Sequence, residues 1–383
     1  MMKNVLRLAV FAALIFAFWF GKSITAQDLS IHVRELFPGN ISIRNDGDIF
    51  SVFSENNVLL GWAAAGTAAG YGGPLTVITG IDTSGTFIGA SIVEHKETPI
   101  FFRMVKPDNY FRELNSLHIS DINFNYSEVA GITGATRSAD AISNSVRSAL
   151  TRISGQNLNI DIPQEERSFR FGLLEAAIII LFIVGILHHH TKHKFREKIR
   201  WISQITGLFV IGFWENSPIN ISKISSFLSG YFPDYYSNLH WYLLLLGFIL
   251  TIFIYNKSIY CSHLCPFGTV QRCVGVIGGG RIRLPSWAIR MMIIFRNTVV
   301  FLAVFLALFT ANPGNISYEP FAAVFALKGS TLQWILLLII LSASLAVRNP
   351  WCHFFCPMRT CEKVVQLLRK PFVKYLRAND QNG

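Results

Sequence analysis

Apolar runs of near membrane-spanning length constrain this chain more than any other feature of its sequence. Apolar residues make up 51 % of its 383 residues and charged residues only 15 %, which is too apolar a composition for one soluble domain. A bilayer core requires roughly 20 mostly apolar helical residues to cross it. The runs that approach this length are 5–20, Leu173–Leu187, Ile202–Phe213, Leu239–Tyr255, Thr298–Ala311 and Leu332–Val347. They predict a polytopic membrane protein with one large polar insert at 27–168.

Basic residues predict the orientation of these spans. With the N-terminus inside and the polar insert outside, the inside segments contain 20 Lys and Arg residues; these segments are 1–7, 188–201, 256–296 and 348–383. The two short outside loops contain only Lys223 and Lys328. This asymmetry fits the positive-inside rule, and it retains the short run 202–213 as a span, because omitting that run would place basic loops outside. The sequence predicts six spans, with both chain ends cytoplasmic. The basic residues behind the net charge of +11 therefore cluster beside the apolar runs, at the membrane boundary, and do not indicate a nucleic-acid-binding protein.

The segment 1–26 is either a cleaved signal peptide or a retained first span. Lys3 and Arg7 lie at the start of its apolar run, and Thr25-Ala26 make only a fair cleavage site. Retention is the favoured interpretation, although the run is a little short for a span. In either case the region that follows is predicted to be exported, and 169–383 is predicted to form an all-α membrane domain.

The polar insert has the pattern of a small α+β domain. Leu75–Ile81 and Thr86–Val93 are rich in β-branched residues and are separated by Asp82-Thr83-Ser84-Gly85, which predicts a β-hairpin. After Thr136, apolar residues recur at spacings of three and four, which predicts a helix with one buried face. These residues are Ala139, Ile142, Val146, Leu150 and Ile153. The insert contains no cysteine, so no disulfide framework holds it together.

The start of this helix is a candidate phosphate site. It follows the small residues of Gly131–Ala135, and a helix start offers free backbone N–H groups and the positive end of the helix dipole. The alternative is an ordinary Thr N-cap, which requires no ligand.

Three stretches of the insert resemble landmarks of the FMN-binding domain family. Thr133-Gly134-Ala135-Thr136 resembles the flavinylation signature Ser/Thr-Gly-Ala-Thr of that family. Gly70–Val77 and Glu94–Pro99 resemble its other two landmarks and occur in the expected order. In that family a flavin transferase esterifies the FMN phosphate to the last Thr of the signature. The resemblance therefore implies an α+β fold and covalent FMN on Thr136.

The resemblance also implies which residues surround the flavin. Beside Thr136 these are Thr133, Gly134, Ala135, Ser138, Glu97 and Thr98. The alternative for Glu94, Lys96 and Glu97 is that they are simple strand charges. One position departs from the family pattern: the family usually carries Asp six residues before the acceptor, where this chain has Ala130.

All six cysteines lie in two groups near the predicted inner ends of spans. They are Cys261, Cys265, Cys273, Cys352, Cys356 and Cys361. Each group begins Cys-x-x-x-Cys-Pro directly after an inward-running span, so the membrane half reads as a degenerate duplication. Two copies related by a pseudo-twofold axis would bring Cys261, Cys265, Cys352 and Cys356 together at the cytoplasmic face.

Four thiolates are the ligand set of an iron–sulfur cluster, and a Cys-Pro step closes the ligand run of bacterial ferredoxins. Thiolates also suit zinc or copper(I), although structural zinc sites more often use paired knuckles. Buried reduced cysteines at helix ends and a thiol redox pair are the remaining alternatives. Disulfides are not expected on a cytoplasmic face.

Three further features have a functional and a structural interpretation. The cluster His188–His193 is either a metal site or a solvated, partly cationic membrane boundary. His263 and His353 lie inside the cysteine motifs and are candidate neighbours of a cluster. Residues 227–236 are either an interfacial anchor or one wall of a quinone pocket. Haem is not expected, because the predicted spans contain no two histidines at facing depths that could serve as its axial ligands.

An exported FMN-binding domain joined to a membrane half with two Cys-x-x-x-Cys-Pro motifs resembles the NosR/NirI-type membrane proteins. The lack of a C-terminal ferredoxin domain makes the chain more similar to the short organohalide-respiration (PceC/RdhC-like) membrane flavoproteins. The resemblance implies electron transfer in the bacterial inner membrane between quinol or a cytoplasmic donor and an exported redox partner, without a catalytic residue. Alternatives are a regulatory or maturation factor for an exported metalloenzyme, and a passive scaffold that carries neither cofactor.

Overall fold

The computed structural model contains two compact units. It describes residues 2–24, 28–70, 72–97, 99–105, 107–122, 124, 136–158, 160, 162, 171–188, 193–233, 235–236, 238–279, 282 and 284–380. The first unit comprises 1–167, 225–233 and 305–317, and the second comprises 168–224, 234–304 and 318–383. Two short segments from the apolar half of the chain thus belong to the unit that holds the polar insert.

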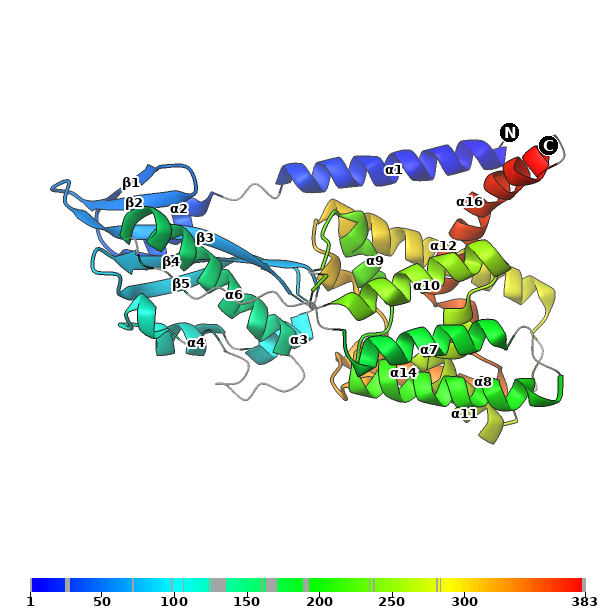
Figure 1. The fold of residues 1–383 in the computed structure, drawn as a ribbon. Helices are drawn as coiled ribbons and strands as arrows, with labels where there is room; N and C mark the ends of the chain where they lie inside the picture. Colours follow the sequence, from blue (N-terminus) through cyan, green and yellow to red (C-terminus); the bar gives the residue numbers. More distant parts are fainter. Residues whose placement is uncertain are drawn as a thin grey trace. The chain divides into compact units, whose positions relative to one another are not determined.

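The first unit is built on a five-stranded antiparallel sheet whose strands follow one another in chain order (Figure 1). The strands are β1 (Ile41–Asn45), β2 (Ile49–Ser54), β3 (Leu59–Ala69), β4 (Pro74–Asp82) and β5 (Phe87–His95). The predicted hairpin is confirmed as β4 and β5. Its turn is held by Asp82, whose Oδ1 accepts hydrogen bonds from the backbone N–H groups of Ser84 and Thr86, each at 2.8 Å.

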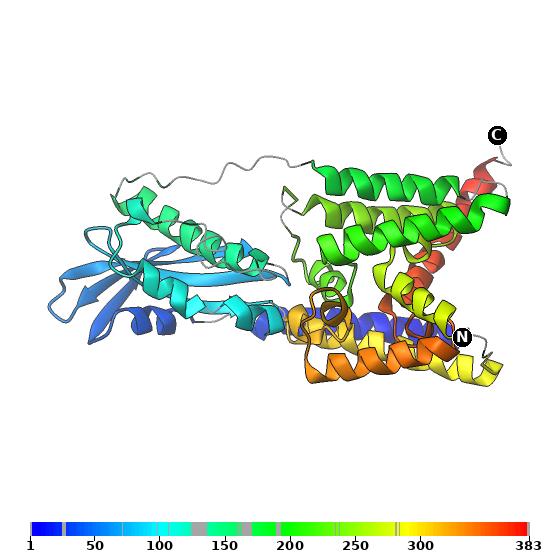
Figure 2. The same cartoon turned by 90° about the horizontal axis from the view of Figure 1, so that it is seen from below.

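Helices cover both faces of this sheet. The helix α6 (Thr136–Ile153) packs on β3 and β4, while α2 (Leu29–Leu36) packs against β4 and β5 from the opposite side (Figure 2). The side chain of Asp28 caps α2 by accepting a hydrogen bond from Ser30 N at 3.0 Å. The five apolar residues that predicted α6 are all fully buried, which confirms the predicted buried face of this helix. The unit is therefore an α+β domain.

Six further helical elements lie within the first unit in the part of the chain that the structure describes. They are α1 (Met2–Ile24), α3 (Pro99–Val105), α4 (Pro107–Leu114), η1 (Ile119–Asp121), η2 (Ser154–Leu158) and η5 (Pro313–Ile316).

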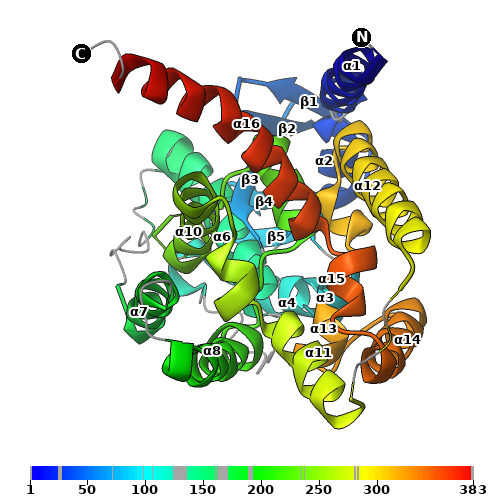
Figure 3. The ribbon, with the colours of Figure 1, turned by 90° about the vertical axis from the view of Figure 1, so that its right-hand side faces the viewer.

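The second unit is helical in all its regular elements that the structure describes (Figure 3). These are α7 (Leu173–Leu187), α8 (His193–Gly207), η3 (Leu208–Trp214), α10 (Leu239–Tyr255), η4 (Tyr260–Leu264), α11 (Pro266–Ile277), α12 (Ser286–Phe309), α13 (Phe321–Phe325), α14 (Thr331–Ala346), α15 (Pro350–Phe354) and α16 (Pro357–Asp380). The helix α9 (Ile221–Leu228) and the end of α12 continue into the first unit. Within the second unit α7 packs on α8 and α10, and α11 packs on α14.

Four of the six predicted spans coincide closely with a helix, namely α1, α7, α10 and α14. The predicted span 202–213 is divided between the end of α8 and η3, and the sixth differs at its start. The helix α12 begins at Ser286, whereas the apolar pattern predicted a span from Thr298. The earlier start includes Arg290 and Arg296, and Arg is a good helix former although it interrupts an apolar run. The helix α12 is long and apolar enough to cross a membrane, and α7, α10 and α14 are shorter apolar helices. The count of six spans stays a prediction.

Candidate functional site

Three sequence-distant segments of the first unit meet at the carboxylate of Glu97. Its Oε1 accepts a hydrogen bond from the backbone N–H of Gly72 at 3.2 Å, and its Oε2 accepts one from the hydroxyl of Ser138 at 2.6 Å. Glu97 is fully buried and Ser138 is 1 % exposed. The glycine-containing turn after β3, the end of β5 and the start of α6 are therefore tied together at one point. These are the three stretches that resemble the FMN-binding domain.

Close approach explains the glycines of this turn. A Cβ atom at position 70 would overlap Oε1 of Glu97, and one at position 72 would overlap the carbonyl oxygen of Lys96. Gly70 N also donates a hydrogen bond to Gly73 O at 2.8 Å, which closes the turn. Side chains at Gly70 or Gly72 would push the turn away from Glu97. The backbone of this turn, a glycine cradle, is thus packed directly against Lys96 and Glu97.

The peptides around Glu97 also contact the two segments that come from the apolar half of the chain. The hydroxyl of Ser226 donates a hydrogen bond to Gly72 O at 2.6 Å. Lys96 is 2 % exposed, forms an ion pair with Glu94, and has its Nζ 5.7 Å from the centroid of the Tyr231 ring. Gly314 lies so close to the carbonyl oxygens of Lys96 and Glu97 that a side chain there would overlap them. Lys96 is therefore buried and paired with the partly exposed Glu94, and a role of either residue beside the flavin stays a prediction.

Other predicted flavin neighbours lie outside the described residues. These are Thr98, Thr133, Gly134 and Ala135, and also Ala130. Thr136 is the first residue of α6, and its side chain lies outside the described part of the chain. The start of α6 suits a flavin phosphate, because an 18-residue helix has unpaired backbone N–H groups and a positive dipole end at its N-terminus.

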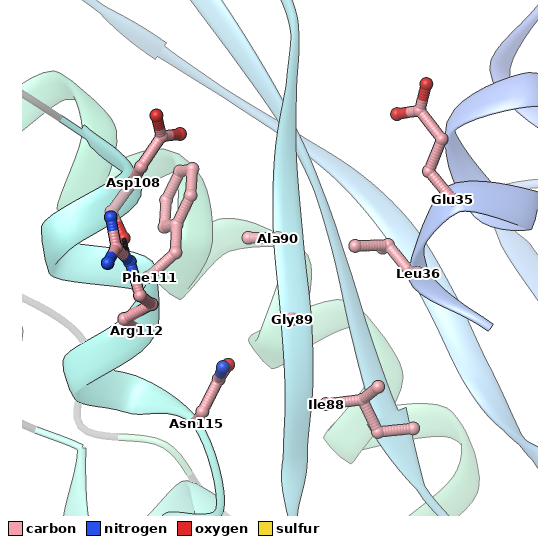
Figure 4. A pocket seen from close by; sticks show the side chains of 9 residues that line it. All are labelled: Glu35, Leu36, Ile88, Gly89, Ala90, Asp108, Phe111, Arg112 and Asn115. Atoms are coloured by element: carbon pink, nitrogen blue, oxygen red, sulfur yellow. Dashed lines mark hydrogen bonds between the residues drawn. The ribbon is translucent and has the colours of Figure 1, made fainter. Parts of the chain in front are cut away.

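A separate open pocket of about 270 Å³ lies along β5, between α2 and α4 (Figure 4). Leu36 from α2 and Phe111 from α4 line it on either side of Gly89 and Ala90, and Arg112 lies among its polar residues. It contains none of the residues predicted to surround the flavin.

In the second unit the two cysteine motifs adopt the same local structure. Each begins in a short helical turn, η4 or α15, and in each the proline occupies the first position of the next helix, α11 or α16. The backbone N–H of the second cysteine donates to the carbonyl five residues earlier in both, from Cys265 to Tyr260 at 2.8 Å and from Cys356 to Trp351 at 2.9 Å. This repetition is what the duplicated motif predicts.

The four predicted ligand thiols lie in one core. Cys356 is buried in the main apolar cluster of the second unit, and Cys261, Cys265 and Cys352 pack against that cluster. Gln271 links the motifs: its amide Nε2 lies 3.8 Å from the sulfur of Cys352, and its Oε1 accepts a hydrogen bond from Trp351 N at 2.9 Å. The thiols of the two motifs are therefore neighbours.

The pKa values of the thiols also reflect the proximity of the two motifs. Burial raises the pKa of the Cys265 thiol to about 12, and the neighbouring Cys352 adds to this rise. Burial also raises the pKa of Cys356 well above its usual value, and Cys352, Cys261 and Cys265 each contribute. Among the described side chains no set of three or more His, Cys, Asp or Glu residues converges closely enough to enclose a metal ion. Four thiols in or against an apolar core that disfavours their ionisation require a strongly positive centre before all can become thiolates, and iron ions would provide one.

The histidines of the motifs make contacts of other kinds. The Nδ1 of His263 lies 2.9 Å from the hydroxyl of Ser203, and its ring contacts that of His188 at a centroid distance of 4.7 Å. Burial, with the nearby His188, lowers the pKa of His263 to about 4, so the ring is neutral at physiological pH. The carbonyl of His353 accepts a hydrogen bond from Arg296. His189 and His190 lie outside the described residues.

Sequence reasoning did not identify Ser226, Gly314, Gln271 or Arg296. Each is an isolated residue in an apolar or loop segment, and each gains its position from a partner more than 50 residues away in the chain. No local pattern marks such residues.

Comparison with known proteins agrees with these two sites. Residues 70–151 match the FMN-binding domain, and residues 237–285 and 332–373 match a 4Fe-4S binding domain. Regulatory protein NosR of Stutzerimonas stutzeri is 21 % identical over 213 residues, which cover 50 % of this chain and 29 % of NosR. The putative electron transport protein YccM of Escherichia coli is 29 % identical over 143 residues, which cover 34 % of this chain and 40 % of YccM. One component of the ion-translocating oxidoreductase complex of Vibrio vulnificus is 31 % identical over 90 residues, which cover 21 % of this chain and 43 % of that component.

The two domains define a class of protein: a flavoprotein with an FMN-binding domain and a 4Fe-4S binding domain. Within that class the chain is similar to the NosR/NirI type of FMN-binding membrane protein. It spans less than half the length of the curated relatives it matches. A closer kinship with the organohalide-respiration proteins stays a prediction.

The bond between Ser138 and Glu97 leads to a first prediction. The variant Ser138→Ala leaves a fully buried carboxylate with one donor fewer, and losing a hydrogen bond to a charged group costs about 1.5–3 kcal/mol. We expect thermal unfolding of the detergent-solubilised protein to show a clear loss of stability of the first unit. Ser42→Ala, on the exposed side of the edge strand β1, is the matched control and should unfold as the wild type does. Equal unfolding temperatures for both variants would contradict the assigned role of Ser138.

Proposed function

We propose that this protein passes electrons between quinol or a cytoplasmic donor and an exported redox partner, using FMN attached covalently to Thr136. The observation that carries the proposal is the convergence on Glu97 of the three segments of the FMN-binding domain. That convergence places a glycine cradle beside the first turn of α6, whose first residue is Thr136. FMN exchanges one or two electrons, and the protein sets its position and potential.

Cys261, Cys265, Cys352 and Cys356 are the proposed ligands of the iron–sulfur cluster. Support comes from the match of both motifs to a 4Fe-4S binding domain and from their shared apolar core. A cluster of this kind transfers single electrons. Thiolates from two separate motifs would also fix the two halves of the duplicated fold to each other.

The proposed location is the bacterial inner membrane, with the FMN domain on the outer side and both cysteine motifs on the cytoplasmic side. Support comes from the apolar helices, from the relatives and from the excess of Lys and Arg in the segments next to the motifs. The proposed partners are a flavin transferase, an exported reductase or other redox protein, and the quinone pool.

A regulatory or maturation role is the second candidate. The observation that favours it is the similarity of this chain to NosR, which is described as a regulatory protein. In this role the cofactors would sense or reduce an exported metalloenzyme, such as a nitrous oxide or nitrite reductase or a reductive dehalogenase, without sustained turnover. The genes that neighbour the coding sequence discriminate the two roles, since an electron-transfer component is expected beside the gene for its redox partner.

Covalent attachment is tested on a denaturing gel viewed under ultraviolet light. Protein made in a host with a flavin transferase should give a fluorescent band, and Thr136→Ala should abolish it because the ester oxygen is lost. Thr151→Ala, farther along the same helix, should keep the band. A band that persists in Thr136→Ala would move the acceptor to Thr133 or Ser138, and the absence of a band in the wild type would contradict covalent FMN.

The shared cluster is tested by iron and sulfide analysis. Cys261→Ser and Cys352→Ser each remove one proposed ligand from a different motif, so each should lower the iron content at least severalfold. Cys273→Ser, which leaves both Cys-x-x-x-Cys-Pro motifs intact, should retain full iron. Full iron content in either ligand variant would mean that the two motifs do not share a site.

A further inference from the structure

Arg296 is a buried cation whose hydrogen-bonding capacity is largely unused. It lies in α12 and is 3 % exposed. Its Nη1 donates a hydrogen bond to the carbonyl of His353 at 3.2 Å. Its Nε and Nη2 atoms are buried and have no hydrogen-bond partner among the residues that the structure describes. A buried guanidinium with unsatisfied donors lowers the stability of the fold, because burial removes the water that would otherwise solvate its charge.

The surroundings of Arg296 supply thiols in place of a carboxylate. No described Asp or Glu side chain forms an ion pair with it. The nearby Arg359 differs in this respect, because its Nη1 is paired with Glu362 at 3.1 Å. Arg359 is a second cation near Arg296. The acidic groups near enough to interact with Arg296 are Cys356, Tyr318 and Cys352. Two of these three are proposed cluster ligands, one on either side of His353.

Neighbouring contacts hold this part of α12 against the second cysteine motif. The ring of Phe295 contacts that of Phe355 at a centroid distance of 5.8 Å. The side chains of Asn297 and Thr360 are joined by a hydrogen bond of 2.9 Å. With residues on both sides of Arg296 packed on the segment that contains Cys356, its guanidinium has a fixed position beside the motif.

We propose that Arg296 is the counter-charge of the thiolate-ligated cluster and raises its reduction potential. The inference rests on the proposed function, since it requires the cluster. When the cluster takes up one electron its net negative charge increases by one, and a fixed positive charge nearby favours that state. Arginine suits this role because it keeps its charge when buried. Arg290, on the same helix but exposed, lacks these features.

The test is a redox titration of the full-length protein in detergent, with the reduced cluster followed by electron paramagnetic resonance. At the ambient potential where the wild-type cluster is half reduced, Arg296→Gln should show a reduced-to-oxidised ratio at least tenfold lower. For a one-electron couple this corresponds to a shift of about 59 mV. Arg296→Lys, which keeps the charge, should stay within about threefold of the wild type, and Arg290→Gln should match the wild type.

Iron content separates failure of the inference from failure of the proposed function. Wild-type protein without iron would refute the cluster itself. An Arg296→Gln protein with full iron and an unchanged ratio would overturn the inference while leaving the cluster in place. If Arg296→Gln loses iron, retention of iron by Arg296→Lys supports the counter-charge, whereas loss of iron from both variants would overturn it in favour of a packing role.

Discussion

The buried carboxylate of Glu97 is the contact on which the architecture of the flavin domain depends. A carboxylate removed from water must be satisfied by donors, and here they come from Gly72 and Ser138, 25 and 41 residues away in the chain. Satisfying this one group fixes the glycine turn and the start of α6 relative to the end of β5. The same constraint excludes side chains at Gly70 and Gly72, so a cradle of backbone atoms forms at the helix terminus.

A related constraint operates at the thiols of the second unit. Cys261, Cys265, Cys352 and Cys356 lie in or against one apolar core, where burial disfavours their charged forms. The unit compensates with a cation: Arg296 is buried beside the second motif and is not neutralised by a carboxylate among the described residues. In both units a buried charged group is thus fixed next to the residues that are proposed to hold a cofactor.

The sequence predicted the parts of the fold that are governed by local patterns. The hairpin of β4 and β5, the buried face of α6 and the repeated Cys-Pro helix starts follow from periodicity and turn chemistry, which act over a few residues. The start of α12 was not predicted, because Arg290 and Arg296 interrupt its apolar run and only tertiary contacts accommodate Arg296. Ser226 and Gly314 were missed for a similar reason, since their partners lie far away in the chain. Glu97 was identified through resemblance, and its role as the meeting point required the structure.

The central claim is that one polypeptide carries both a covalent flavin and a cluster held by two motifs. Its most direct test is the flavin, iron and sulfide content of the intact protein purified without oxygen from a host with a flavin transferase. The account predicts one FMN that remains bound after denaturation, together with four iron and four sulfide atoms per chain. Protein that contains flavin but no iron, or iron but no covalent flavin, would contradict it.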